Sequence, residues 1–308
     1  MKRGKNLIFF LIIYSLIILS TPPTSANFLS DFWGKITGEA TSATTSLNIT
    51  IGNSAPTIPF VQPISAQNPT ESSTTKITFN FTAQDADGVS NLDDSTAQAR
   101  FQRSGEPTRQ NLSCVAGATS GIQKNYSCSI DMWYFDQAGS WTINVTIKDI
   151  NNAQGENSST TFTFNTLTAM VMSPTSLTWP TVGLNDVDVS SNNDPITINN
   201  TGNAESIRIN VTGYDLRGET TITKYIFANN FTVSNLSDSG CSGRIMQNAT
   251  SLNITSPITF RGNNSLNYKN ATSGQQNTTY CLKGVPQDAT AQSYSTAGSA
   301  AWIVAIVV

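Results

Sequence analysis

The chain of 308 residues contains only 12% charged residues and has a formal net charge of −3. Its polarity comes mostly from 36 serines, 41 threonines and 31 asparagines, and the scarcity of lysine and glutamate disfavours a helical fold. A mildly acidic chain without a basic cluster argues against nucleic acid as a partner. The sequence holds no histidine, which excludes Ser-His-Asp, Cys-His and H-E-x-x-H chemistry. We expect neither an enzyme nor a cofactor.

The N-terminus has the three parts of a secretory signal. Basic residues at positions 2, 3 and 5 precede an apolar stretch over residues 7–19, which is shorter than the roughly 20 residues of a spanning helix. Thr24-Ser25-Ala26 then supplies small residues for cleavage, as the third part of such a signal requires. The pattern predicts a signal peptide over residues 1–26.

Two other interpretations of this segment stay open. Residues 20–25 could lengthen the apolar stretch into an uncleaved membrane anchor. Cleavage after Gly4, as in a pilin precursor, would leave the apolar helix on the mature protein. All three interpretations export the rest of the chain, so we expect contact with a membrane only through this segment if it is uncleaved.

Residues 27–46 separate the signal from the first predicted domain. Residues 27–36 could form a short amphipathic turn or helix, whereas residues 37–46 are rich in Thr, Ser, Ala and Gly and lack periodicity. That composition is typical of a flexible linker.

From residue 47 onward the hydrophobic pattern has a period of two. Apolar side chains alternate with polar ones in residues 75–82, 141–148 and 161–165. Weaker strand candidates are residues 97–102, 110–115 and 123–130. Alternation marks half-buried antiparallel strands, and about seven short strands in roughly 120 residues predict a β-sandwich over residues 47–168.

A second domain is expected over residues 169–308. Residues 196–199 and 207–212 alternate in the same way on either side of Asn200-Thr-Gly-Asn203. Two alternating segments joined by such a turn predict a β-hairpin. The predicted fold class is therefore all-β, with two tandem antiparallel β-sandwiches after an N-terminal signal or anchor helix.

Short motifs carry a resemblance to known domains. Asp85-Ala-Asp-Gly88 follows one predicted strand, and Phe135 and Trp141 flank Gly139 before another, which resembles the PKD and cadherin-like branch of immunoglobulin-like domains. With Asn200-Thr-Gly-Asn203 and a Gly-x-x-Thr-Gly linker at residues 34–38, the whole is similar to secreted immunoglobulin-like surface proteins of archaea. The resemblance implies two immunoglobulin-like sandwiches outside the cell and says little about activity.

Four cysteines fall into two groups, Cys114 with Cys128 and Cys241 with Cys281. An even number in an exported chain predicts two disulfides. Pairing within each group is the economical arrangement, although the connectivity cannot be derived from the sequence. The spacing matches no C-x-x-C zinc or redox motif.

Fifteen N-x-[ST] sequons without an intervening proline are present, about twice the number expected by chance. They begin at Asn48, Asn80, Asn111, Asn125, Asn144, Asn157, Asn199, Asn210, Asn230, Asn235, Asn248, Asn253, Asn263, Asn270 and Asn277. Alternation with a Ser/Thr-rich outer face could generate some of them, but asparagine is depleted in strands. We therefore expect N-linked glycans at several of these sites.

Asp85 and Asp87, with Asp93 or Asp94, are weak calcium candidates. Ca²⁺ takes six or more oxygen ligands, and one such cluster supplies too few. Because D-x-D-G also makes a good Asx turn, we favour a structural turn and predict no metal site.

The C-terminal residues 300–308 are apolar on both faces of a strand and too few to span a bilayer. The favoured interpretation is a centrally buried last strand of the second sandwich. Two others stay open: the strand pairs with a neighbouring subunit in a filament, or the chain is truncated before a transmembrane helix.

The expected function is that of a non-catalytic, secreted or cell-surface structural or adhesive protein whose partners are other surface proteins or glycans. One alternative is a carbohydrate- or ligand-binding accessory module, for which Trp133, Tyr134 and Trp141 are the candidate aromatic residues. Another is a filament subunit that associates with itself through residues 300–308.

Overall fold

The computed structural model describes residues 45–235, 241–254 and 274–308. The predictions for residues 1–26, and for residues 27–46 apart from the last two, concern residues outside this part. The described part is all-β and contains antiparallel sheets with no α-helix. Three short 3₁₀ turns are η1 (Val89–Asn91), η2 (Ala228–Asn230) and η3 (Thr296–Gly298). The predicted all-β class is thus confirmed.

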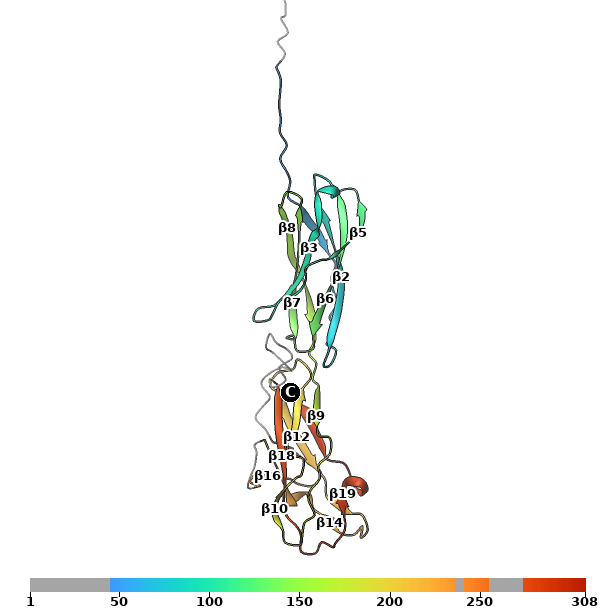
Figure 1. Cartoon of the computed structure of the whole chain (residues 1–308), viewed down its shortest axis with the longest axis vertical. Coiled ribbons are helices and arrows are strands. Elements are labelled where there is room, and N and C mark those ends of the chain that lie inside the picture. The colour runs from blue at the N-terminus through green and yellow to red at the C-terminus, as the bar shows by residue number, and fades with distance from the viewer. Residues whose placement is uncertain (1–44, 236–240, 255–273) are drawn as a thin grey trace, which may run out of the picture. The chain divides into compact units, whose positions relative to one another are not determined.

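The strands from residue 57 to residue 164 form two four-stranded sheets (Figure 1, blue to green). In chain order they are β1 (Thr57–Val61), β2 (Thr74–Gln84), β3 (Leu92–Gln102), β4 (Arg109–Asn111), β5 (Val115–Ser120), β6 (Gln123–Trp133), β7 (Gly139–Asp149) and β8 (Gln154–Phe164). One sheet has the order β1-β2-β6-β5 and the other β4-β3-β7-β8. The three strongly alternating segments lie in β2, β7 and β8, as predicted.

Alternation explains how these two sheets share a core. In β7 the side chains of Trp141, Ile143, Val145 and Ile147 are fully buried, and the threonines and asparagine between them face outward. A single apolar cluster combines side chains from both sheets, which is the arrangement of a β-sandwich. Burying such side chains contributes about 2 kcal/mol each.

A buried ion pair joins β4 to the segment between β6 and β7. Asp136 is fully buried, accepts a hydrogen bond from the Trp133 N–H at 2.7 Å and is paired with the Arg109 guanidinium. Arg109 also lies 5.7 Å from the centre of the Phe135 ring. Burial raises the pKa of the Asp136 carboxyl, and the hydrogen bonds and charge of Arg109 oppose that rise.

The strands after residue 169 form three further sheets (Figure 1, yellow to red). In chain order they are β9 (Met170–Ser173), β10 (Val187–Ser190), β11 (Ile196–Asn200), β12 (Arg208–Gly213), β13 (Leu216–Gly218), β14 (Tyr225–Ile226), β15 (Phe231–Ser234), β16 (Arg244–Ile245), β17 (Thr250–Asn253), β18 (Gln275–Gly284), β19 (Tyr294–Ser295) and β20 (Ile303–Val307). The largest sheet has the order β16-β15-β18-β11-β9, with β10 also on β18. The others are β17-β12-β20 and β14-β13-β19.

The predicted hairpin between β11 and β12 is wrong. β11 pairs with β9 and β18, whereas β12 pairs with β17 and β20 in another sheet. The polar groups of the connecting segment bond elsewhere: Asn200 Nδ2 donates to the Ala204 carbonyl at 2.8 Å, and Asn203 Oδ1 accepts from the Leu167 N–H at 2.6 Å. The segment is therefore a crossing between sheets.

The C-terminal strand β20 is present but is not centrally buried as predicted. It pairs with β12 and stands last in the order of its sheet. Val304 and Ile306 pack against the apolar core, whereas Ile303 and Val307 are 49% and 45% exposed. One face of the strand thus belongs to the core and the other is open in the described part.

Candidate functional site

The structure pairs Cys114 with Cys128 and Cys241 with Cys281, the pairing within each group that the sequence favoured. The first bridge joins the segment before β5 to β6, and the second joins the segment before β16 to β18. No cysteine is free. Two structural disulfides indicate an oxidising, extracytoplasmic environment.

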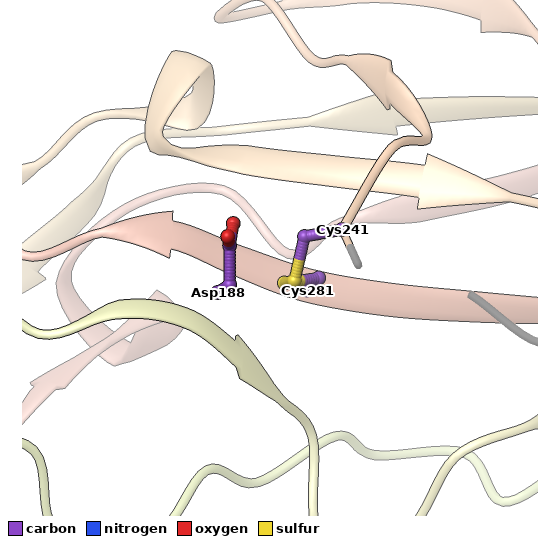
Figure 2. A group of neighbouring side chains, drawn as sticks. All are labelled: Asp188, Cys241 and Cys281. Carbon is purple, nitrogen blue, oxygen red and sulfur yellow. A yellow bond between two sulfur atoms is a disulfide. The ribbon is translucent and has the colours of Figure 1, made fainter. Parts of the chain in front are cut away.

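Asp188 lies beside the Cys241–Cys281 bridge, as Figure 2 shows. In the described part, these three residues form a group whose ligand atoms are close enough together to hold a metal ion. A cysteine binds a metal ion as its thiolate, whereas here the two sulfur atoms are bonded to each other. The Asp188 carboxylate is paired with Lys283 at 3.0 Å, so the group is a disulfide beside a surface ion pair.

The Asp85–Gly88 motif forms a turn. Asp85 is fully buried, and its Oδ1 accepts a hydrogen bond from the Asp87 N–H at 2.8 Å, the geometry of an Asx turn. Asp87 Oδ2 accepts from the Ser54 N–H at 2.8 Å. The weak calcium candidates are thus each bonded to backbone within the turn and the preceding segment. Asp93 Oδ1 accepts a hydrogen bond from the Ser95 N–H at 3.1 Å, and the Asp94 carboxylate forms an ion pair with Lys124 at 2.6 Å.

A chain of amides joins this turn to the end of β7. Asn91 Nδ2 donates to Asp85 Oδ2 at 3.2 Å and to Asn53 Oδ1 at 3.1 Å. Asn53 Nδ2 in turn donates to Asp149 Oδ2 at 2.6 Å, and this bond is the main cause that lowers the pKa of the Asp149 carboxyl. Sequence reasoning missed this cluster because Asn53 and Asp149 are 96 residues apart.

The three aromatic candidates for a ligand platform are not equivalent. Trp141 is fully buried, and its indole N–H donates to the Gln137 carbonyl at 2.8 Å. Trp133 and Tyr134 are half-buried against Phe135, with ring centroids 5.7 and 5.1 Å away. Trp141 is therefore a core residue, and Trp133 and Tyr134 belong to the same packed corner as Arg109.

None of the sequon asparagines in the described part is buried. The exposed ones are Asn48, Asn80, Asn125, Asn248 and Asn277. The half-buried ones are Asn111, Asn144, Asn157, Asn199, Asn210, Asn230, Asn235 and Asn253. Asn263 and Asn270 lie outside the described residues. By contrast, the buried asparagines of the described part, Asn91, Asn200 and Asn203, all stand outside sequons.

Among the described residues, no helix is long and apolar enough to cross a membrane. In comparisons with known proteins, no family model matches the chain and no curated protein matches it.

Proposed function

We propose that this protein is a non-catalytic structural or adhesive protein of the cell surface or the extracellular space, which presents glycosylated sandwich faces to other surface molecules. The observation that carries the proposal is the outer face of the sheet β1-β2-β6-β5. There Asn80 lies opposite Ser127, and Thr82 lies opposite Asn125. Two exposed sequons therefore lie on neighbouring strands of one face.

The chemistry of this face suits a modified surface. Thr78 and Ser129 share a hydrogen bond at 2.6 Å, and Thr82 donates to Asn125 Oδ1 at 2.7 Å. Hydroxyl and amide groups thus cover the centre of the face. A glycan on Asn80 or Asn125 would project from the outer face of a sheet whose inner face, with Phe79 and Phe81, belongs to the buried core.

The strand order supports an immunoglobulin-like assignment of the first sandwich. With β1 to β8 renamed A, B, C, C′, D, E, F and G, the two sheets become A-B-E-D and C′-C-F-G. These are the orders of immunoglobulin domains that carry strand C′. Cys114–Cys128 joins the D and E region here, in place of the B–F bridge of antibody domains, so this bridge departs from the antibody pattern.

Mapping glycopeptides of the native protein tests the proposal. We expect glycans on Asn80 and Asn125 and none on Asn68, an exposed asparagine whose Asn-Pro-Thr sequence carries the excluded proline. Unmodified peptides at both Asn80 and Asn125 would contradict it. Asn68 is the matched control because it stands in the same sandwich with similar exposure.

A second candidate function, a filament subunit, is favoured by the open face of β20. Ile303 and Val307 are exposed on a strand that stands last in its sheet, and such an edge is a template for strand addition. Replacing both with lysine should abolish concentration-dependent association in analytical ultracentrifugation. Ile222→Lys, at another exposed isoleucine, should leave it unchanged. A wild-type protein that stays monomeric at all concentrations would exclude this candidate.

A further inference from the structure

A cavity of about 1060 Å³, partly open to solvent, lies among the strands after residue 169, in the predicted second sandwich. Its buried lining comes from the large sheet, through Phe231, Tyr280 and Leu282, and from β12, through Val211. Ligand pockets in proteins commonly measure roughly 300–1,000 Å³, so the space is that of a complete ligand site.

Aromatic rings form one wall of this cavity. The Trp302 ring lies 5.1 Å from that of Phe231 and 6.4 Å from that of Trp179, measured between centroids. The Trp302 indole N–H donates to the Tyr214 carbonyl at 2.8 Å, and the Trp179 N–H donates to the Val189 carbonyl at 3.2 Å. Because both indole N–H groups are bonded to backbone, the tryptophans offer apolar ring surface to the cavity.

The cavity contains no charged side chain. None of the residues that line it is an aspartate, glutamate, lysine or arginine. Burial raises the pKa of the Tyr280 hydroxyl to about 12, so this group is neutral at physiological pH. An ionised group placed against this lining would lose its hydration without gaining a partner, and the lining therefore selects an uncharged molecule.

Polar groups are gathered where the cavity meets solvent. Among the lining residues Thr290 is exposed, and Gln292 and Tyr294 are half-buried beside it. Gln292 Nε2 donates to Thr290 Oγ1 at 2.8 Å, and the Tyr294 hydroxyl accepts from the Thr290 N–H at 2.9 Å. This hydroxyl and amide group, the polar rim, can donate to and accept from the hydroxyl of a ligand.

The aromatic and aliphatic part of the lining favours an apolar occupant. Water gains little there, because an ordered water needs two to four polar partners. An apolar chain in contact with Trp179 and Trp302 is stabilised by the burial of apolar surface, at roughly 25 cal/mol per Å².

From these observations we propose that the second sandwich binds a neutral lipid with one hydrocarbon chain and a hydroxyl-bearing head. The chain lies against Trp179, Phe231 and Trp302, and the head hydroxyls bond to the polar rim. The residues that line the cavity include no sequon asparagine and neither Ile303 nor Val307, so this proposal does not rest on glycosylation or on strand addition at β20.

Tryptophan fluorescence of the full exported chain tests the proposal, with a monoacylglycerol that carries a dibrominated stearoyl chain as the quenching probe. We expect saturable quenching below the probe's micellar concentration. Dibromostearate, which is anionic at neutral pH, should bind at least about tenfold more weakly. Absence of saturable quenching by the monoacylglycerol, or equal binding of the anionic probe, would overturn the proposal.

Variants place the quenching in the cavity. Replacing both Trp179 and Trp302 with phenylalanine should remove most of the quenching, whereas Trp133→Phe in the first sandwich should leave it unchanged. Ala289 lines the cavity and packs on the core, so Ala289→Phe should weaken binding at least about tenfold, with Ala66→Phe on an exposed loop as its control. If Ala289→Phe does not fold, the double replacement of Trp179 and Trp302 is the test. Quenching that persists in that variant would contradict binding in this cavity.

Discussion

At the scale of single residues, hydrogen bonds to buried carboxylates hold the ends of the first sandwich. Asp149 is buried at the end of β7 and accepts from the Asn151 and Ala153 N–H groups at 2.9 and 2.8 Å, in addition to Asn53. These donors favour the ionised carboxyl. A carboxyl whose pKa is lowered in the folded state stabilises it above the unfolded pKa, and this contribution is lost as the pH falls through the folded pKa.

Replacing Asn53 should therefore have a pH-dependent effect on stability. Asn53→Ala removes the largest cause of the lowered pKa of Asp149, so the variant should be less stable than wild type at pH 7. The difference should narrow as the pH falls below about 4, where the unfolded carboxyl is protonated. Urea unfolding at several pH values measures it. Asn68→Ala, whose amide oxygen is bonded to Asn165, is the control without a carboxylate partner, and a pH-independent difference for Asn53→Ala would contradict the account.

The ion pair of Arg109 and Asp136 gives a second prediction. Arg109→Met leaves a buried carboxylate without its cation, which typically costs about 3 kcal/mol of unfolding free energy. The pKa of Asp136 is already raised by burial and should rise further. A raised pKa means that stability is lost as the pH increases through the folded pKa, so the defect should be larger at pH 7 than below about 3.9.

The control for this variant is Arg100→Met. Arg100 is half-buried on neighbouring β3, and its guanidinium donates to the neutral Gln98 Oε1 at 3.2 Å. Its replacement should change the unfolding free energy by only about 0.5 kcal/mol. Equal losses for the two arginine variants in urea unfolding would show that the Asp136 pair has no special role.

At the scale of elements, the two faces of β20 differ, because alternate side chains of a strand point to opposite sides. Ile306 packs on the apolar core formed by the strands after residue 169, whereas Ile303 is exposed. Ile306→Ala should therefore cost about 2 kcal/mol in unfolding free energy, whereas Ile303→Ala should change it by less than about 0.5 kcal/mol. The two variants remove the same atoms from the same strand, so equal costs in thermal or urea unfolding would contradict the described orientation.

The alternation of apolar and polar residues predicted the positions of strands well, but it predicted poorly which strands pair with each other. The alternation in residues 141–148 predicts β7 because side chains of a strand point to opposite faces in turn. The same signal at β11 and β12 could not say that they belong to different sheets, because pairing depends on distant strands such as β18 and β20. Asn200 and Asn203 turn the chain through hydrogen bonds that the turn motif alone does not reveal.

Site features that are short sequence motifs could be predicted, whereas those formed by residues far apart in the chain could not. Sequons and cysteines are short motifs, so their positions could be found directly. The cavity could not, because Trp179 and Trp302 are 123 positions apart and meet only in the folded chain. The Asn53–Asp149 hydrogen bond could not be predicted for the same reason, because the two residues are 96 positions apart in the sequence.

At the scale of the whole molecule, the disulfides and the sequons support the same compartment by independent chemistry. Two bridges persist in an oxidising environment, and the sequon asparagines of the described part all reach solvent at least in part. A surface whose polarity comes from hydroxyls and amides is a suitable support for glycans. The proposed location outside the cell rests on this agreement, whereas the proposed structural or adhesive role rests on the outer face of the sheet β1-β2-β6-β5.

The most direct test of the central claim, that the chain acts outside the cell, is labelling of intact cells and their medium with a membrane-impermeant amine reagent. We expect modification of the exposed Lys76 and Lys283 without lysis. Lys124, which is 18% exposed and paired with Asp94, should react more slowly and so report a folded protein. Modification of Lys76 and Lys283 only after the cells are lysed would contradict the account.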